Sequence, residues 1–398
     1  MRVLHVLHMS LPALCGYSIR SSCIIENQKK LGIDVQVVTS ARHPNGPELT
    51  EEIEGTKYCR TPELTGPQPP LIREWRLMHA LRKSVDAAIS DFKPDVVHAH
   101  SPVLVGRPAM AAARAAGLPF VYEIRDLWEN ASVDRGKFSD GSVLYKIARG
   151  AETGVIRGAD QVVAICEQLR KELEPRAVSA DRLSVVGNGV EAAKFLPQVA
   201  DEELKASLNL QGKKIFGYIG TFQPYEGIAN LIKAVPAITA RVPNAHLLIT
   251  GEDPQLPALR ELASSMGLDA SVTFAGRVPH ERVRAMLALA DVMIYPRILT
   301  RVTALTTPLK PLEAMAMERA VMVSDVPAMQ ELVEDGKTGL VFRAGEPADL
   351  AAKCIRLLED DYLRSELGKN ARNYVTKERS WSELVLAYQD IYNRLVAA

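Results

Sequence analysis

Lys310 and Glu313 stand where a proline-rich turn runs into an apolar helix start, in Thr307-Pro308-Leu309-Lys310-Pro311-Leu312-Glu313-Ala314-Met315-Ala316. A helix N-terminus offers unpaired N–H groups and partial positive charge, and the Lys310 ammonium adds a full charge, so this junction suits an anion. Glu313, one turn further, can accept hydrogen bonds from hydroxyls of the same ligand. A phosphate together with a sugar hydroxyl indicates a nucleotide. Further contacts in this segment are expected from Pro308, Leu309 and Leu312.

Two arginines precede this segment and could add to its charge. Arg297 and Arg301 follow an apolar run that is predicted to be a strand, and both lie upstream of Lys310. Three cations that approach one helix start would neutralise a diphosphate well. The alternative is that the two arginines are solvated side chains of a loop.

Three glycine-containing loops follow predicted strands. Gly16 lies in the loop Ser10–Tyr17 after the first strand and before a helix, and Gly220 ends the first strand of the second half. Gly276 precedes Arg277 and Val278, whose main-chain groups could read the edge of a base stacked on the glycine. Glycine permits close approach of a ligand to the backbone, although the dinucleotide fingerprint G-x-G-x-x-G is missing. Each loop could also be an ordinary connection.

Polar residues also end two strands of the first half. In the run 97–102, His98 and His100 share a direction because side chains alternate along a strand. His98 is expected in the core, and His100, at the strand tip, is the candidate that faces a ligand. A metal pair is the competing idea, but no carboxylate or cysteine cluster matches it. Arg125 and Asp126 follow the next strand and either form an internal ion pair or face an acceptor.

The composition is that of an ordinary globular protein. The chain has 398 residues, 47% of them hydrophobic and 24% charged, and its formal net charge is zero. This balance argues against nucleic-acid binding. Five scattered cysteines favour a reducing compartment and neither disulfides nor a zinc site, so the cytoplasm is the expected location. The apolar N-terminus is interpreted as a buried strand rather than a signal peptide, and no apolar run is long enough to span a membrane.

Strand-like and helix-like segments alternate through the chain, which predicts an α/β fold with parallel sheets covered by helices. The alternation restarts near residue 214, so two Rossmann-like domains are expected. The predicted organisation is an N-terminal domain over 1–196, a linker over 197–213, a second domain over 214–380 and a C-terminal helix over 381–398. That helix, with its apolar residues at helical spacing over Trp381–Leu395, has no strand after it and must dock on a folded surface.

These motifs, in this order, resemble the glycosyl transferases group 1 family of retaining GT-B glycosyltransferases, in a subset similar to enzymes of bacterial exopolysaccharide and cell-surface glycan assembly. Nearly the whole chain takes part in the resemblance. The residues that carry it are the Gly16 loop, Val97-His98-Ala99-His100, Ile165-Cys166-Glu167, Asn188-Gly189-Val190, Tyr218-Ile219-Gly220, Phe274-Ala275-Gly276-Arg277-Val278, Lys310–Ala316 and Gly336-Lys337-Thr338-Gly339-Leu340-Val341-Phe342.

The resemblance implies two domains that face each other across a cleft. The N-terminal domain would bind a saccharide, lipid-linked or small-molecule acceptor, the second domain a UDP- or GDP-sugar, and the last helix would cross back to the first domain. Glu313 matches the carboxylate that binds ribose hydroxyls, and His100 the histidine near the donor sugar. Transfer with retention and without a metal or other cofactor is expected. A nucleotide-sugar 2-epimerase and a non-catalytic nucleotide-sugar-binding subunit are the alternatives.

The sequence departs from the family pattern at several positions. Leu305 stands where many relatives carry the first of two glutamates, and Thr221 and Glu226 stand where relatives often have Arg and Lys. Lys310, with Arg297 or Arg301, is expected to replace that charge from another loop. Glu318-Arg319 also stands where Gly-Lys is common.

Peripheral membrane contact is a further possibility. The segment Leu71–Ile89 is predicted to be a helix in which apolar residues such as Trp75 lie beside Arg73 and Arg76. A lipid-linked acceptor would make such a helix useful at the inner face of a membrane. An ordinary helix of the domain is the alternative. The sequence does not indicate an oligomeric state.

Overall fold

The computed structural model describes residues 1–398 apart from 45–47, 68, 177–178, 252–253 and 398, and it divides into two compact units. Unit 1 comprises Met1–Asn188 and Trp381–Ala398, and unit 2 comprises Gly189–Ser380. The division therefore precedes the predicted boundary at 196. The residues predicted as a linker, 197–213, belong to unit 2 and include helix α7 (Glu202–Ser207).

Unit 1 is built on an eight-stranded sheet in the order β3-β4-β2-β1-β5-β6-β7-β8. Neighbouring strands are parallel except for the antiparallel pair β3 and β4, a hairpin that sequence analysis missed because TEEI carries two charges among four residues. The other strands are the short apolar runs expected of a sheet buried on both faces. Their bounds are β1 Arg2–Leu7, β2 Asp34–Thr39, β3 Thr50–Ile53, β4 Thr56–Arg60, β5 Val96–His100, β6 Phe120–Ile124, β7 Gln161–Ala164 and β8 Leu183–Val185.

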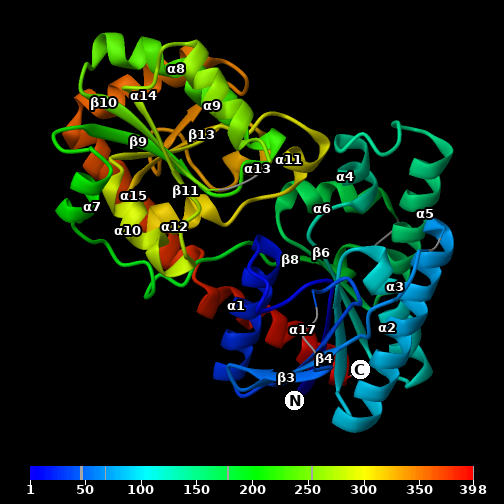
Figure 1. Cartoon of the computed structure of the whole chain (residues 1–398). Helices are drawn as coiled ribbons and strands as arrows, with labels where there is room; N and C mark the ends of the chain where they lie inside the picture. The colour runs from blue at the N-terminus through cyan, green and yellow to red at the C-terminus, as the bar shows by residue number, and fades with distance from the viewer. Residues whose placement is uncertain (45–47, 68, 177–178, 252–253, 398) are drawn as a thin grey trace. The chain divides into compact units, whose positions relative to one another are not determined.

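Helices cover both faces of this sheet. Helices α2, α3 and α5 lie side by side on one face, whereas α1 and the C-terminal helices pack on the other (Figure 1). The chain moves from β1 to β2 through α1 and from β4 back past β1 to β5 through α2, so right-handed crossovers place these two helices on opposite faces. The helices are α1 Gly16–Lys30, α2 Pro70–Phe92, α3 Val103–Ala115, α4 Trp128–Asp134, α5 Val143–Gly158 and α6 Glu167–Leu173, with 3₁₀ turns η1 Glu174–Arg176 and η2 Ala180–Arg182.

Unit 2 is built on a six-stranded, fully parallel sheet in the order β11-β10-β9-β12-β13-β14. Helices α8, α9 and α14 cover one face and α10, α12 and α15 the other (Figure 1). The strands are β9 Lys214–Ile219, β10 Ala245–Thr250, β11 Val272–Gly276, β12 Val292–Tyr295, β13 Ala320–Ser324 and β14 Leu340–Phe342. The helices after α7 are η3 Pro224–Glu226, α8 Ile228–Arg241, α9 Leu256–Ser265, η4 His280–Arg282, α10 Val283–Leu289, α11 Arg301–Leu305, α12 Lys310–Ala316, α13 Pro327–Gln330, α14 Pro347–Glu359 and α15 Asp361–Glu378.

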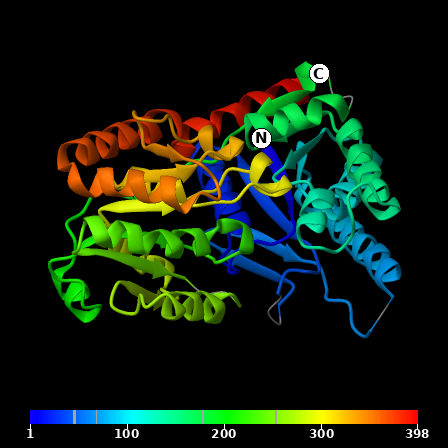
Figure 2. The ribbon, with the colours of Figure 1, turned by 90° about the horizontal axis from the view of Figure 1, so that it is seen from above.

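The C-terminal segment forms two helices rather than the single one predicted over Trp381–Leu395. Helix α16 (Trp381–Leu384) and helix α17 (Leu386–Ala397) are separated at Val385. The helical spacing of apolar residues continues through the break, so periodicity alone does not reveal it. Helix α17, red in Figure 2, packs against β5 of unit 1 and buries Tyr388 and Tyr392 completely.

The predicted alternation of strands and helices is confirmed in both units, and the two parallel-sheet bodies have the predicted α/β class. Among the helices that the structure describes, none combines the length and the apolar character that crossing a bilayer requires.

Candidate functional site

In unit 2, the carboxyl ends of neighbouring parallel strands bring together two of the predicted glycines. Gly220 follows β9, Gly251 follows β10, and Gly276 ends β11. The Gly220 N–H donates to the Thr250 carbonyl at 2.9 Å, and the Gly251 N–H donates to the Gly276 carbonyl at 2.8 Å. Open parallel sheets bind ligands at this edge. The predicted positions Gly220 and Gly276 therefore lie on one continuous edge.

Gly220 makes room for the side chain of Lys310. Its φ is +148°, a conformation that L side chains rarely adopt, and a Cβ there would lie 2.3 Å from Lys310 Cε. The close approach predicted for Gly220 is thus made by Lys310 itself. Any larger residue would displace the lysine stem from the strand end.

Lys310 begins helix α12, as predicted, and its ammonium is held over β9. Its Nζ donates to the Tyr218 hydroxyl at 2.7 Å and lies 5.0 Å from the centroid of the Tyr218 ring. The Glu226 carboxylate is also close, with Oε1 3.6 Å from Nζ. Burial lowers the pKa of Lys310, Glu226 opposes that shift and Arg297 adds to it. The lysine side chain is nevertheless 24% exposed and can meet a ligand.

Arg297 does not extend toward a ligand with Lys310. Its guanidinium is buried and binds Glu226 through both carboxylate oxygens, with Nη2–Oε1 at 2.9 Å and Nε–Oε2 at 3.3 Å. Its third nitrogen, Nη1, donates to the Thr306 carbonyl at 3.0 Å. The prediction that Arg297 supplies free charge at the helix start is therefore wrong. A buried guanidinium needs a countercharge, and Glu226 supplies it.

Glu226 is the functional candidate that sequence analysis did not assign. Burial alone would raise the pKa of its carboxyl, but Arg297 and Lys310 outweigh burial and lower the pKa to about 2. The carboxylate is therefore ionised at neutral pH. The available signal was the presence of an acidic residue in a loop where the resemblance leads one to expect a cation.

Glu313 lies on the first turn of α12, as predicted. Burial raises the pKa of its carboxyl to about 7, although Lys310 acts in the opposite direction. Within the described residues, its side chain is half-buried and forms no hydrogen bond or ion pair. A carboxyl group that titrates near neutrality can accept hydrogen bonds from sugar hydroxyls when it is ionised and can donate one to them when it is protonated.

The other residues predicted at the donor site differ in how far they are buried. Leu312 is fully buried in the hydrophobic core of unit 2, so the contact predicted for it can come only from its backbone. Arg301 starts α11 and is half-buried. Pro308 is buried, Leu309 and Val278 are half-buried, and Thr221 and Arg277 are exposed. Gly16, in unit 1, is the exposed first residue of α1, and a Cβ there would meet no atom within 4 Å.

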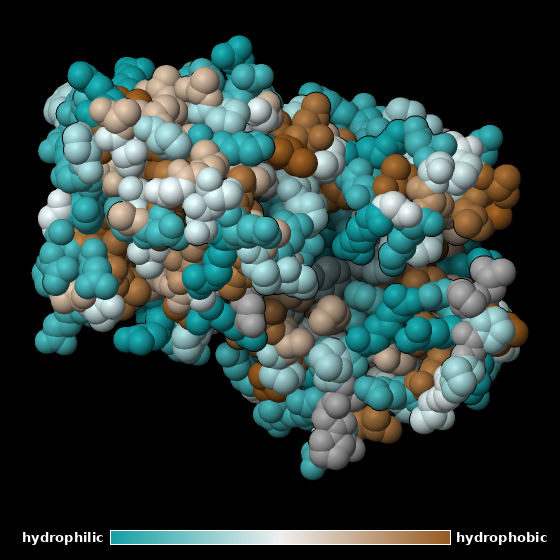
Figure 3. Space-filling view, turned by 45° about the horizontal axis from the view of Figure 1, so that its top comes forward, coloured by the Kyte–Doolittle hydropathy of each residue, from teal (hydrophilic) through white to brown (hydrophobic). Residues whose placement is uncertain are grey.

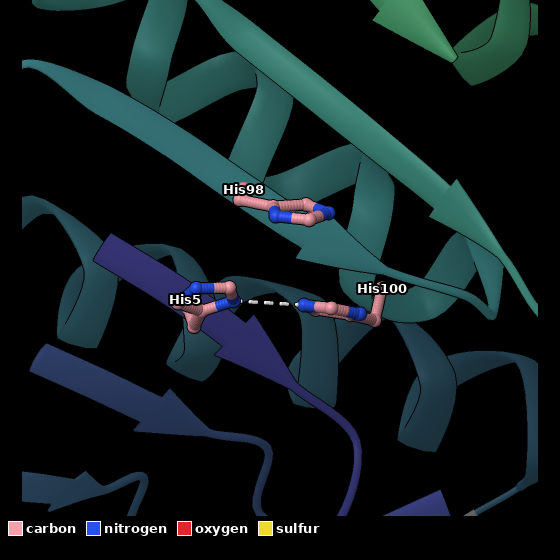
Figure 4. Close-up of side chains that lie close together, drawn as sticks. All are labelled: His5, His98 and His100. Carbon is pink, nitrogen blue, oxygen red and sulfur yellow. Dashed lines mark hydrogen bonds between the residues drawn. The ribbon is translucent and has the colours of Figure 1, made fainter. Parts of the chain in front are cut away.

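In unit 1, His100 is fully enclosed rather than turned toward solvent. Its Nε2 lies 2.9 Å from His5 Nδ1 (Figure 4). Its Nδ1 lies 2.7 Å from Arg125 Nη2. Both ring nitrogens are therefore occupied by protein groups. The expectation that the side chain at the strand tip faces outward is corrected, because β1 and the segment after β6 cover it. Burial lowers the pKa of His100 to about 3.

One set of tautomers satisfies the contacts of His100 with Arg125 and His5, and Glu123 Oε1 also lies 3.2 Å from His100 Nδ1. A guanidinium only donates, so His100 Nδ1 accepts from Arg125, and His100 Nε2–H donates to His5 Nδ1. His5 Nε2–H then donates to Gln28 Oε1 at 2.8 Å. The Gln28 amide in turn donates to the Tyr392 hydroxyl at 3.0 Å. This chain requires neutral imidazoles, in agreement with the pKa of about 4 that burial imposes on His5.

The three buried histidines His5, His98 and His100 lie close enough together to suggest a metal site. Their geometry argues for a hydrogen-bonded stack instead. The rings of His98 and His100 are stacked, with centroids 4.3 Å apart and an interplanar angle of 21° (Figure 4). Stacked rings direct their nitrogen lone pairs side by side rather than toward one point. Arg125 also places positive charge directly on His100.

Glu123 is the anionic centre of this buried cluster. Its Oε1 accepts from Arg20 Nε at 3.0 Å and from Arg125 Nε at 2.8 Å, and its Oε2 accepts from the Tyr388 hydroxyl of α17. Burial would raise the pKa of the Glu123 carboxyl, but Arg20 and Arg125 hold it well below its usual value. The carboxylate thereby joins the sheet, helix α1 and the C-terminal helix of the same unit.

Of the two alternatives considered for Arg125, the structure shows the internal ion pair, which it forms with Glu123. Besides Glu123 and His100, its Nη1 donates to the Tyr17 carbonyl at 2.7 Å and to Ser21 Oγ at 2.9 Å. These contacts enclose Arg125, so the alternative in which it faces an acceptor is not supported. Asp126 is half-buried, and burial raises the pKa of its carboxyl.

Comparison with known proteins places both units in one class. The model of the family described as glycosyl transferases group 1 matches residues 199–374, and the model described as glycosyl transferase 4-like domain matches residues 16–189. An alpha-D-kanosaminyltransferase from Streptomyces kanamyceticus is 29% identical over 266 residues, which cover 65% of this chain and 66% of that enzyme. An uncharacterised glycosyltransferase from Methanocaldococcus jannaschii is 27% identical over 61% of this chain, and the match spans 60% of its length.

Solved structures agree over the full chain. Sucrose-phosphate synthase from Thermosynechococcus elongatus superposes with a TM-score of 0.81 at 22% identity and full coverage of both chains. Anabaena HepE, solved in complex with UDP and glucose, superposes with a TM-score of 0.74 at 16% identity, covering 99% of this chain and all of that chain. At these identities the likeness shows the fold, which is GT-B.

Proposed function

Because this chain belongs to the glycosyl transferases group 1 family, we propose that it transfers a sugar from a nucleoside diphosphate sugar to a saccharide, lipid-linked or small-molecule acceptor. Unit 2 would bind the donor, and unit 1 would bind the acceptor. UDP is the nucleotide that HepE, a protein of the same fold, was solved with, and it is the first donor nucleotide to test here. GDP is the second.

The observation that carries this proposal is the Lys310 ammonium beside Gly220, with Glu313 one turn away. Departure of a nucleoside diphosphate develops negative charge on its phosphates, and a preorganised cation stabilises that charge without reorganising. Lys310 is held by Tyr218 and Glu226 before any ligand arrives, and part of it stays accessible. Glu313 would accept hydrogen bonds from the ribose hydroxyls.

We further propose that the reaction retains the anomeric configuration and requires no metal. Lys310 would supply the charge that a metal supplies elsewhere. The acceptor would attack on the face from which the diphosphate departs. Asp126 and Gly16 are the proposed contacts of the acceptor unit. The proposed location is the cytoplasm.

The test begins with thermal denaturation against a panel of UDP-, GDP- and ADP-sugars, since a ligand that binds only the folded state raises the melting temperature. Transfer is then measured with the donor that binds. Lys310→Ala should lower kcat/KM about 10²- to 10³-fold, the range expected for removing one preorganised group that stabilises developing charge. Lys337→Ala, which removes an exposed lysine of the same unit paired with Glu334, should leave it unchanged.

Full transfer activity of Lys310→Ala would contradict the assignment. Nuclear magnetic resonance of the product anomeric proton tests retention, and addition of a chelator tests metal independence. Conversion of the sugar nucleotide without any acceptor would instead indicate the 2-epimerase. Binding without turnover across an acceptor panel would indicate the non-catalytic subunit.

We also propose peripheral membrane contact through the first turns of α2. Ile72 and Trp75 are exposed there, Trp75 to 62%, and Arg73 and Arg76 are exposed beside them. The face drawn in Figure 3 is mostly hydrophilic, with hydrophobic residues in separate patches. Trp75→Ala should reduce sedimentation with anionic vesicles, whereas Val199→Ala, at an apolar residue of unit 2 that is even more exposed, should not. Equal sedimentation of both variants would remove the idea.

A further inference from the structure

Glu226 is not one of the residues proposed to contact the donor, yet it lies beside two cations. It ends the 3₁₀ turn η3, its side chain is buried, and its two oxygens bind Arg297 in a bidentate pair. The oxygen that is 2.9 Å from Arg297 Nη2 is also the one that lies 3.6 Å from Lys310 Nζ. One carboxylate therefore contacts both cations.

The backbone fixes Glu226 in this place. The next residue, Gly227, has φ +71°, and a Cβ there would lie 2.0 Å from the Pro296 carbonyl oxygen. The Ile298 N–H donates to the Tyr225 carbonyl at 3.0 Å. The turn that carries Glu226 is thus pressed directly against the loop that carries Arg297, so the carboxylate has little freedom to follow a mobile partner.

The charges of this cluster do not cancel. Glu226 contributes one negative charge, and Arg297 and Lys310 contribute one positive charge each. Arg297 is buried and uses all three nitrogens on protein acceptors. The excess positive charge is therefore presented through Lys310, the partly exposed member.

Resting on the proposed donor site, we propose that Glu226 is a positioning residue: it neutralises Arg297 and holds the Lys310 ammonium, protonated and beside Gly220, for the donor diphosphate. Glu226 itself does not touch the donor. Its effect reaches the ligand through the charge state and the position of Lys310.

The groups that face Lys310 come from every neighbouring element. Tyr218 lies on β9, Glu226 on η3, Arg297 after β12, and Glu313 on α12. Only the two carboxylates raise the pKa of Lys310, whereas burial and Arg297 lower it. Removing the charge of Glu226 should thus favour the neutral amine, since Arg297 would be left without a countercharge.

The experiment compares Glu226→Gln with the wild-type chain. Glutamine keeps the size of the side chain and removes its charge. The pKa of Lys310 is measured without ligand, from the ¹³Cε chemical shift of labelled lysine assigned by Lys310→Arg. It should fall by about one unit or more, given a charge 3.6 Å away. In UDP binding measured against pH, the alkaline limb should move to lower pH by the same amount.

Two further variants separate positioning from a structural role. Asp291→Asn removes a carboxylate that accepts from the Ile215 N–H at the opposite end of the same sheet. This variant should shift neither the pKa of Lys310 nor the alkaline limb of UDP binding. The double variant Glu226→Gln/Arg297→Gln removes the uncompensated cation as well. It should recover most of the pKa and most of the UDP affinity lost in the single variant, and it serves as the measurement if Glu226→Gln does not fold.

An unchanged Lys310 pKa in Glu226→Gln, or no recovery in the double variant, would overturn the proposal. Failure of the wild-type chain to bind any nucleotide or nucleotide sugar would instead overturn the proposed function. The ligand-free titration separates these two failures, because it reports on Glu226 whether or not a donor binds.

Discussion

Glu123→Gln should destabilise unit 1 strongly, because it leaves two buried arginines without a countercharge. The Glu123 carboxylate accepts from Arg20 Nε at 3.0 Å and from Arg125 Nε at 2.8 Å, and the two arginines are only 2% and 6% exposed. Glutamine keeps the shape of the side chain but not its charge. Breaking a buried ion pair by removing one partner costs about 3–5 kcal/mol.

The size of unit 1 converts this loss into a shift of the melting temperature. For domains of roughly this size, 1 kcal/mol lowers the melting temperature by about 2–4 °C, so the expected shift is roughly 6–20 °C. Tyr388→Phe, which removes only the hydroxyl that donates to Glu123, should cost about 1 kcal/mol. The exposed pair of Glu167 with Arg170 supplies the control, because Glu167→Gln should cost no more than about 1 kcal/mol.

Tryptophan fluorescence during urea unfolding is the assay, because all three tryptophans of the chain belong to unit 1. They are Trp75, Trp128 and Trp381. The fluorescence transition therefore reports on unit 1 even if unit 2 unfolds separately. A loss below about 1 kcal/mol for Glu123→Gln, equal to that of the control, would refute the claim that this carboxylate holds the cluster together.

Two further predictions concern acid and the strand-end glycine. Burial lowers the pKa of His5 to about 4 and that of His100 to about 3, so both are neutral when folded and take up protons on unfolding below their usual pKa of 6.5. Their contribution to the stability of unit 1 is complete above pH 6.5. The free energy of unfolding of unit 1 should fall from pH 6.5 toward pH 4 by about 1.4 kcal/mol per pH unit for each histidine. Urea titrations in which this free energy does not depend on pH over this range would count against buried neutral rings. Gly220→Ala should weaken UDP binding, measured by calorimetry, at least tenfold because it displaces Lys310. Gly336→Ala, at another glycine with positive φ but open surroundings, should leave UDP affinity unchanged. Equal affinity in both variants would show that Gly220 does not confine the Lys310 stem.

Local sequence signals were sufficient for the elements and for the ends of the strands. The apolar runs predicted strands at the positions of β1, β9 and β12, and the Pro-Leu-Lys-Pro turn predicted a helix start in the segment where α12 begins. Gly220 was recognised because a glycine at a strand end is itself a local signal. Such features depend on neighbouring residues in the chain, which periodicity and turn chemistry describe.

Charge partners could not be obtained in this way. Arg297 was expected to face a ligand, but a carboxylate 71 residues earlier in the chain takes its guanidinium. For Arg125 the sequence left an internal ion pair and an acceptor contact both open, and its contacts with Glu123, His100 and helix α1 decide for the ion pair. Glu123 is only two residues from Arg125, but no local pattern shows that Glu226 meets Arg297, since that contact depends on how distant loops pack.

The sequence by itself therefore determined the two α/β units, most of their alternating strands and helices, and the placement of Lys310 and Glu313 on one helix turn. Only the tertiary structure decided which cations are neutralised, that His100 is enclosed by His5 and Arg125, and that Glu226 meets Lys310. The physical reason is that secondary structure follows short-range steric and hydrophobic periodicity. The charge state and availability of a side chain, in contrast, follow burial and contacts between residues far apart in the chain.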